Sequence, residues 1–232
     1  MTVVIRLDDA GDREDLGAFV ARAVRMDPQA LVRLRNSPSR PPRPPVDGDA
    51  PVVGGSDVAA RLQVWATTPF DALVTRSVAG RVDPPDITVH AANLLPGIAV
   101  SRSTEIDPGP VVDPLWRTQL PPLAGWSLVD TVPAAVVTDL VDRGSASARD
   151  NVSPAGGTSS SLLDQQVLTV SGAGYTVAVP MRCLFALSGM GFAGGGGDAS
   201  DVRVFATDAW LRLDARFGAV VRRRHSLLPL VF

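Results

Sequence analysis

The sequence predicts an α+β protein in two parts, and three observations lead to this fold class. Apolar and polar residues alternate over several short segments, a period that is typical of half-buried strands. In other segments apolar residues recur every three or four positions, which indicates amphipathic helices. Of the 232 residues, 45% are hydrophobic and 20% are charged, a balance that favours a folded globular chain over a disordered one.

Two proline-rich stretches suggest the domain organisation. At ~100–200 residues per domain, this length fits one large domain or two small ones. The stretch 107–124 contains five prolines, and the hydrophobic pattern differs on its two sides. We therefore expect an α+β domain over 1–106, a proline-rich linker over 107–124 and a second domain over 125–232. Six prolines and three glycines over 36–57 predict a long loop inside the first domain.

The N-terminal part predicts a mixed sheet with one amphipathic helix. Residues 3–7 form a short apolar strand, and Asp12 is suited to cap the helix that follows. One face of this helix carries five apolar side chains, Leu16, Phe19, Val20, Ala23 and Val24. Further strands are expected over 31–35, 61–66, 72–78 and 87–90. A short helical turn over 92–95 is expected to end before Pro96.

The C-terminal part predicts helices followed by a three-stranded element that contains a β-hairpin. Asp130 or Thr131 is suited to cap a first helix, with Pro133 in its first turn and Gly144 at its end. A second helix is expected over 160–167, although the same residues also fit the start of a strand. The remaining expected elements are an extended segment over 175–179, a helix over 181–188, and strands over 202–206, 210–215 and 219–223.

Few residues suit catalysis or metal binding. The chain has one cysteine, Cys183, one tyrosine, and two histidines, His90 and His225. A lone cysteine excludes an intrachain disulfide and a thiolate zinc site. A G-x-G-x-x-G match over 189–194 follows a predicted helix, whereas dinucleotide binding requires a preceding strand. We therefore predict no catalytic, cofactor-binding or metal-binding residue, and no cofactor.

No segment predicts insertion into a membrane or export. The uncharged stretches are shorter than the ~20 apolar residues that cross a bilayer. The first residues turn acidic at once and lack the basic and apolar regions of a signal peptide. We expect a cytoplasmic protein that does not bind a membrane.

Positive charge is concentrated near the C-terminus. All 22 basic residues are arginine, and residues 201–232 hold six of them against three aspartates. On the predicted hairpin Arg212 and Arg216 share one face, and Arg222, Arg223 and Arg224 extend it. A hairpin of this kind after a short helix resembles the phosphate-contacting wing of a winged-helix module. The net charge of −2 argues against that function. These five arginines are the candidate residues for binding nucleic acid or another anion.

Two stretches carry a family resemblance. One is LQVWATTPFDALVTRSV over 62–78, and the other is VAVPMRCLFALSGMGF over 177–192 followed by AWLRLDARFGAVVRR over 209–223. They resemble a class of uncharacterised two-domain proteins from GC-rich bacteria. The resemblance implies an α+β N-terminal domain and a helix-plus-hairpin C-terminal domain, and it implies no activity.

The sequence favours a non-enzymatic interaction or regulatory protein. Groups suited to acid–base or nucleophilic chemistry are scarce. The glycine- and proline-rich loops and the apolar segment 226–232 favour docking to a protein partner or self-association. Two alternatives stay open. One is nucleic-acid binding through the winged-helix-like hairpin. The other is an enzyme or binder that holds a small anionic ligand with arginines and aspartates brought together by the fold.

Overall fold

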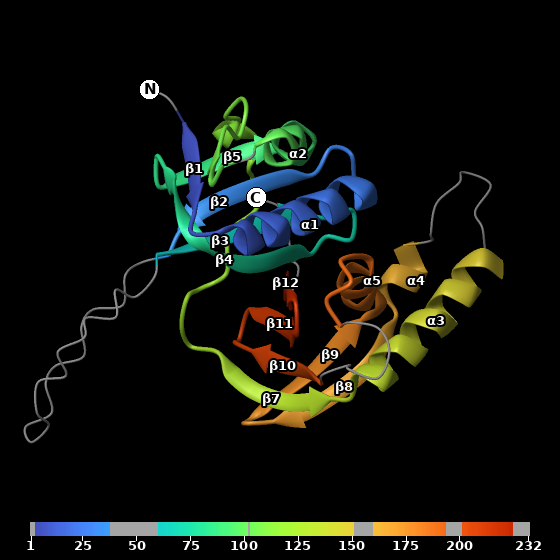
Figure 1. Cartoon of the computed structure of the whole chain (residues 1–232). Helices are drawn as coiled ribbons and strands as arrows, with labels where there is room; N and C mark the ends of the chain where they lie inside the picture. The colour runs from blue at the N-terminus through green and yellow to red at the C-terminus, as the bar shows by residue number, and fades with distance from the viewer. Residues whose placement is uncertain (1–2, 38–59, 102, 151–159, 194–200, 225–232) are drawn as a thin grey trace, which may run out of the picture.

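The computed structural model describes residues 3–37, 60–101, 103–150, 160–193 and 201–224. Within these ranges the chain forms two halves, which Figure 1 shows one above the other. The predicted loop over 36–57 and the apolar segment 226–232 lie largely or wholly outside the described residues. In the described part of the chain, no helix is both long and apolar enough to cross a membrane.

The first half contains the predicted strands, together with a second helix. Its elements are β1 (Val4–Leu7), α1 (Ala10–Met26), β2 (Leu31–Asn36), β3 (Arg61–Thr67), β4 (Leu73–Asp83), β5 (Asp86–His90), α2 (Ala91–Val100) and β6 (Glu105–Ile106). Asp9, not Asp12, caps α1 by accepting a hydrogen bond from the backbone N–H of Asp12. The carboxylate of Asp12 instead accepts from the backbone N–H of Ala79 in β4, at 2.8 Å.

The prediction of a single helix in this half, with only a turn before Pro96, was wrong. The turn is the start of α2, and Pro96 lies inside that helix. Leu94 and Ile98 are buried on either side of the proline, and α2 packs against α1. Burial of these side chains therefore outweighs the backbone hydrogen bond that the proline cannot donate.

The second half opens with a strand. It contains β7 (Ser127–Val132), α3 (Ala134–Asp150), α4 (Ser160–Asp164), β8 (Gln166–Gly172), β9 (Tyr175–Pro180), α5 (Met181–Gly189), β10 (Val202–Ala206), β11 (Trp210–Ala215) and β12 (Gly218–Arg223). The 3-10 helix η1 (Asp113–Leu115) lies in the segment between the halves and contacts β5. The predicted helix start at Asp130 or Thr131 was wrong, because both residues belong to β7. Gly144 does not end α3. It lies inside the helix, where the side chain of Met181 from α5 occupies the space that a Cβ would need.

One antiparallel sheet runs through both halves. Its strand order is β5-β2-β3-β4-β12-β11-β10-β7, with β1 paired to β4 and β6 paired to β1, and β8 and β9 form a separate two-stranded sheet. The halves join where Leu73, Val74 and Thr75 of β4 pair with Val221, Val220 and Ala219 of β12. The predicted β11–β12 hairpin is therefore an inner part of the sheet rather than a projecting wing, since β10 and β4 pair with its two outer edges.

The two faces of this sheet are covered differently. The helices cover one face and bury the main core, which includes Phe19, Leu34 and Phe192. On the other face a smaller cluster forms around Trp65 and Trp210. Leu73 and Val221 are buried with them, and Trp116, Leu120 and Trp126 pack against the group. The segment between the halves thus lies against the sheet and gathers all four tryptophans of the chain in one place.

Candidate functional site at the junction of the two halves

Two hollows lie at the ends of the short β4–β12 ladder. We call the first the junction pocket. It has a volume of about 280 Å³ and is lined by Thr67, Thr68, Asp71, Ala72, Leu73, Thr118, Trp210, Val221, Arg222 and Arg223. We call the second the arginine cleft. It has a volume of about 460 Å³ and lies where β4 continues beyond β12.

A tight turn before β4 shapes the junction pocket. The hydroxyl of Thr68 donates to the carbonyl oxygen of Ala72 at 2.7 Å and accepts from the backbone N–H of Phe70 at 3.3 Å. Asp71 adopts a left-handed backbone with φ of 51°, which aspartate tolerates better than most residues. The turn places the Asp71 carboxylate 3.1 Å from the Arg222 guanidinium and 3.8 Å from that of Arg182.

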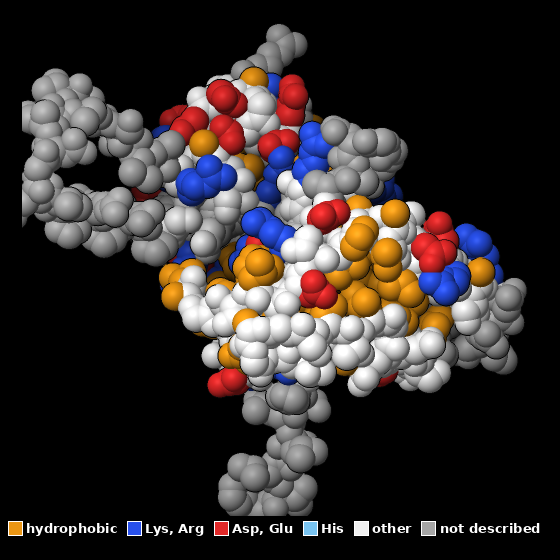
Figure 2. Space-filling view, turned by 90° about the horizontal axis from the view of Figure 1, so that it is seen from below, with side chains coloured by type: hydrophobic (Ala, Val, Ile, Leu, Met, Phe, Trp, Pro, Cys, Tyr) orange, Lys and Arg blue, Asp and Glu red, His pale blue; other side chains and the backbone are white. Residues whose placement is uncertain are grey.

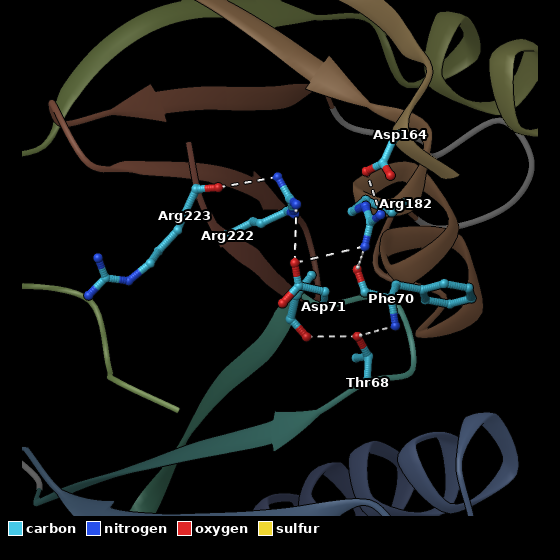
Figure 3. Close-up of polar contacts among 8 residues, drawn as sticks. Thr68, Phe70, Asp71, Asp164, Arg182, Arg222 and Arg223 are labelled. Carbon is cyan, nitrogen blue, oxygen red and sulfur yellow. Dashed lines mark hydrogen bonds and ion pairs between the residues drawn. The ribbon is translucent and has the colours of Figure 1, made fainter. Parts of the chain in front are cut away.

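These three side chains form a charged lock between the halves. Figure 3 shows Asp71 between Arg222 of β12 and Arg182 of α5. Arg182 also donates to the carbonyl oxygen of Phe70 at 3.1 Å and pairs with Asp164. Its side chain is only 11% exposed. The lock therefore ties the turn of the first half to three elements of the second, α4, α5 and β12.

The floor of the junction pocket is apolar and its rim is cationic. Leu73, Val221 and Trp210 are buried at the floor. The guanidinium of Arg223 lies 4.9 Å from the centre of the Trp210 ring and donates to the side chain of Gln119. In Figure 3 the Arg223 side chain extends away from Asp71. The pocket thus combines an apolar surface with a cation that is not engaged by the lock.

The arginine cleft is polar. It is lined by Asp12, Asp15, Arg61, Gln63, Trp65, Thr75, Arg76, Ser77, Arg203, Arg212, Asp214, Ala215, Arg216, Phe217, Gly218 and Ala219. Five arginines and three aspartates give this lining a net charge of +2. Alternation along β3 places Arg61, Gln63 and Trp65 on the face opposite the helices.

The structure divides the five predicted arginines. Arg212 and Arg216 line the arginine cleft, whereas Arg222 and Arg223 line the junction pocket. Arg224 donates to the carbonyl oxygens of Thr207 and Thr176, both at 2.9 Å. These two bonds hold its guanidinium within the second half.

Several residues of the two hollows were missed in the sequence. Arg61 and Arg203 line the cleft, and Asp71 and Arg182 form the lock together with Arg222. The strand period does place Arg61 on the correct face of β3. However, only the long-range pairing of β4 with β12 brings it near the hairpin, and the sequence carries no signal for that pairing.

Cys183 is a buried residue of the core. Burial raises the pKa of its thiol to about 12, although the nearby charges of Arg222 and Arg182 act in the opposite direction. A thiol held in this neutral form is a poor nucleophile and a poor metal ligand. Among the described residues, no cluster of histidine, cysteine and acidic side chains is arranged to hold a metal ion.

The fold is that of the sliding clamps. The chain superposes on the DNA polymerase sliding clamp of Caulobacter crescentus with a TM-score of 0.54 and 14% identity, covering 99% of this chain and 67% of that one. For the putative DNA polymerase III beta subunit of Eubacterium rectale the TM-score is 0.55 at 10% identity, with coverages of 97% and 65%. The beta chain from Streptococcus pneumoniae gives 0.54 at 8%, with coverages of 98% and 66%.

The chain spans about two thirds of the length of these clamps. At such low identity the similarity shows the fold alone. A comparison with curated proteins finds no match.

Two family models match the sequence itself. The chain belongs to the family described as "Domain of unknown function (DUF8010)", whose model matches residues 1–118. A second model, "Domain of unknown function (DUF8185)", matches residues 121–227. The predicted resemblance to uncharacterised two-domain proteins is thus confirmed. The GC-rich bacterial source stays a prediction.

Proposed function

We propose that this protein is a non-enzymatic interaction protein that binds a short segment of a partner protein in the junction pocket. The observation that carries the proposal is the junction pocket itself, which has an apolar floor and a cationic rim and lies where the two halves meet. The sliding-clamp fold supports it, because the structures that share this fold include subunits of a DNA polymerase assembly.

The pocket suggests the chemistry of the bound segment. The floor of Leu73, Val221 and Trp210 suits one or two apolar side chains. Arg223 suits a neighbouring carboxylate, since the contacts of its guanidinium within the described chain are with Gln119 and the Trp210 ring. We therefore expect an extended segment with apolar residues next to an aspartate, a glutamate or a C-terminal carboxylate.

A pocket-filling variant tests this function. Thr118 is exposed at the pocket, so Thr118→Trp is expected to occupy the space without disturbing the core. Peptides are selected from a random phage library on the intact chain, and binding of a selected, fluorescein-labelled peptide is followed by fluorescence anisotropy. We expect Thr118→Trp to weaken binding at least ~10-fold, because the apolar floor is then covered.

The matched control is Thr169→Trp, which adds the same side chain at an exposed position of β8, remote from the pocket. It should leave affinity within about twofold. The proposal is overturned if no selected peptide responds to Thr118→Trp, or if both tryptophan variants weaken binding equally.

Self-association stays a prediction, and one surface supports it. From below, the C-terminal half shows apolar side chains gathered in a broad patch with charged side chains at its margins (Figure 2). Leu128 of β7 is 48% exposed, and Val136 of α3 is 41% exposed. Exposed apolar surface of this kind commonly marks a contact between proteins.

A further inference from the structure

The arginine cleft holds positive charge that the protein does not neutralise. Arg76 pairs with Asp15, and Arg212 pairs with Asp214. Among the described residues, the Arg61 guanidinium donates to the carbonyl oxygen of Ser77 alone, at 3.3 Å. Within the described residues neither Arg61 nor Arg203 forms an ion pair. Both are exposed, so they are available to an anion.

Aromatic rings lie beside the arginines of the cleft. The guanidinium of Arg203 is 5.7 Å from the Phe205 ring centre, and that of Arg216 is 5.2 Å from the Phe217 ring centre. Phe217 lies in the turn between β11 and β12, lines the cleft and is 36% exposed. Cations beside aromatic rings are a pattern by which proteins hold single strands, since guanidinium groups contact phosphates and rings stack on bases. Of the two rings, Phe217 is the exposed one.

The helix-covered side of the molecule does not offer the same chemistry. Among the described side chains, the exposed charged residues are Glu14 and Arg25 on α1, and Asp139, Asp142, Arg143 and Arg149 on α3. These exposed charges sum to zero, whereas the lining of the arginine cleft has a net charge of +2. The cleft between β4 and the β11–β12 hairpin is therefore the better surface for a polyanion.

The shape of the cleft distinguishes a polymer from a small ligand. Small-molecule sites are mostly apolar and bury most of the ligand. The arginine cleft is polar and open to solvent, so a free phosphate would keep much of its hydration. A strand that crosses the cleft places several phosphates near separate arginines and releases their counterions together.

We propose that the arginine cleft binds single-stranded nucleic acid, with Arg61, Arg203 and Arg216 contacting phosphates and Phe217 stacking on a base. This site is distinct from the junction pocket and adds a second partner class to the proposed function.

Fluorescence anisotropy with a labelled dT20 strand tests the proposal. We expect the triple variant Arg61→Gln, Arg203→Gln, Arg216→Gln to bind at least ~10-fold more weakly at 50 mM salt. For three phosphates, log K should fall against log salt with a slope of about −2. Phe217→Ala should weaken binding several-fold, by roughly the contribution of one stacked base.

Three controls separate this site from general electrostatics and from misfolding. Arg25→Gln, Arg143→Gln, Arg149→Gln removes the same charge from exposed positions of α1 and α3 and should leave dT20 affinity within about twofold. The charge-keeping triple Arg61→Lys, Arg203→Lys, Arg216→Lys should retain most of the affinity. Thr118→Trp should leave it unchanged, because it alters only the junction pocket.

Four outcomes overturn the proposal. The first is no binding of dT20 at 50 mM salt. The second is equal weakening by the control triple. The third is complete displacement by low millimolar inorganic phosphate, which would make the cleft a small-anion site. The fourth is equally tight binding of a duplex combined with no effect of Phe217→Ala.

Discussion

The junction pocket and the arginine cleft lie at opposite ends of one short ladder, yet their charges are held in different ways. At the pocket, Asp71 fixes Arg182 and Arg222 in a lock above buried apolar side chains. At the cleft, Arg61 and Arg203 stand on strand faces without a carboxylate partner among the described residues. An apolar floor beside the single cation of Arg223 favours a specific apolar segment with one carboxylate, whereas the arginines of the cleft favour a polyanion. The β4–β12 pairing therefore has a different candidate recognition surface at each end, one for a peptide and one for a polyanion.

The largest effect is expected from filling the space where the two halves meet. A Cβ at Gly218 would lie 2.6 Å from ring atoms of Phe192 and 2.8 Å from the carbonyl oxygen of Thr75. Phe192 is buried in the main core, and the carbonyl oxygen of Thr75 belongs to the backbone of β4. Gly218→Ala should therefore lower the free energy of unfolding by about 2–3 kcal/mol, as overpacking does in other cores. Urea denaturation followed by circular dichroism measures it.

Gly125→Ala is the matched control for Gly218→Ala. Nothing lies within 4 Å of a Cβ at Gly125, but its φ of 85° is in the left-handed region. This change should cost only about 1 kcal/mol, from the backbone alone. If the two variants lose equal stability, the close packing around Gly218 does not contribute to stability, and the prediction is wrong.

The second-largest effect on stability is expected from breaking the ion pairs of Asp71 while the β4–β12 pairing stays intact. Asp71→Asn keeps the shape and tolerates the left-handed backbone, but it removes the charge that faces Arg182 and Arg222. Both guanidinium groups are mostly buried, and their Nε atoms have no partner among the described residues. We expect a loss of about 1–2 kcal/mol, less than for a fully buried pair, because Asp71 itself is exposed.

Salt distinguishes the lock from ordinary packing. The loss caused by Asp71→Asn should shrink at 1 M NaCl, where exposed charges are screened. The exposed pair of Arg143 and Asp139 provides the comparison. Asp139→Asn should change stability by less than about 0.5 kcal/mol. Equal effects at Asp71 and Asp139 would contradict the assignment of Asp71 as a lock.

The alternation of apolar and polar residues was enough to predict most strands, because it arises from the burial of one face of the sheet. It failed where long-range packing overrides a local signal. Pro96 and Gly144 disfavour a helix when judged from the local sequence alone. Each nevertheless lies inside a helix that packs against a neighbouring helix. Asp130 and Thr131 are good capping residues, yet pairing with β10 keeps them in strand β7.

The candidate sites were only partly predictable for the same reason. The face shared by Arg212 and Arg216 follows from strand alternation, and both residues do line one cleft. The separation of Arg222 and Arg223 from them depends on the β4–β12 pairing, which joins residues more than 140 positions apart. Secondary-structure propensity and hydrophobic periodicity carry no information about such a pairing. The sequence therefore did not indicate Asp71 as the partner of Arg222.

The smallest expected effect is a pH-dependent change in stability that comes from the buried thiol of Cys183. In the folded protein the pKa of this thiol is about 12, against an ordinary value of about 9. Between these values the unfolded chain loses the thiol proton while the folded chain keeps it, so stability falls as the pH rises. At pH 9.5 the wild type should have lost about 1 kcal/mol through this group. Cys183→Ala should lack that loss, and groups common to both proteins cancel in the difference.

Alkylation connects this measurement to the lock. With the thiol buried and neutral, iodoacetamide at pH 8 should label Cys183 in wild type only through transient opening. Asp71→Asn should speed labelling about 5–30-fold, the factor that corresponds to its loss of 1–2 kcal/mol if opening at the junction exposes α5. Asp139→Asn should leave the labelling rate unchanged. A rate that ignores Asp71→Asn would show that the core around Cys183 opens independently of the seam between the halves.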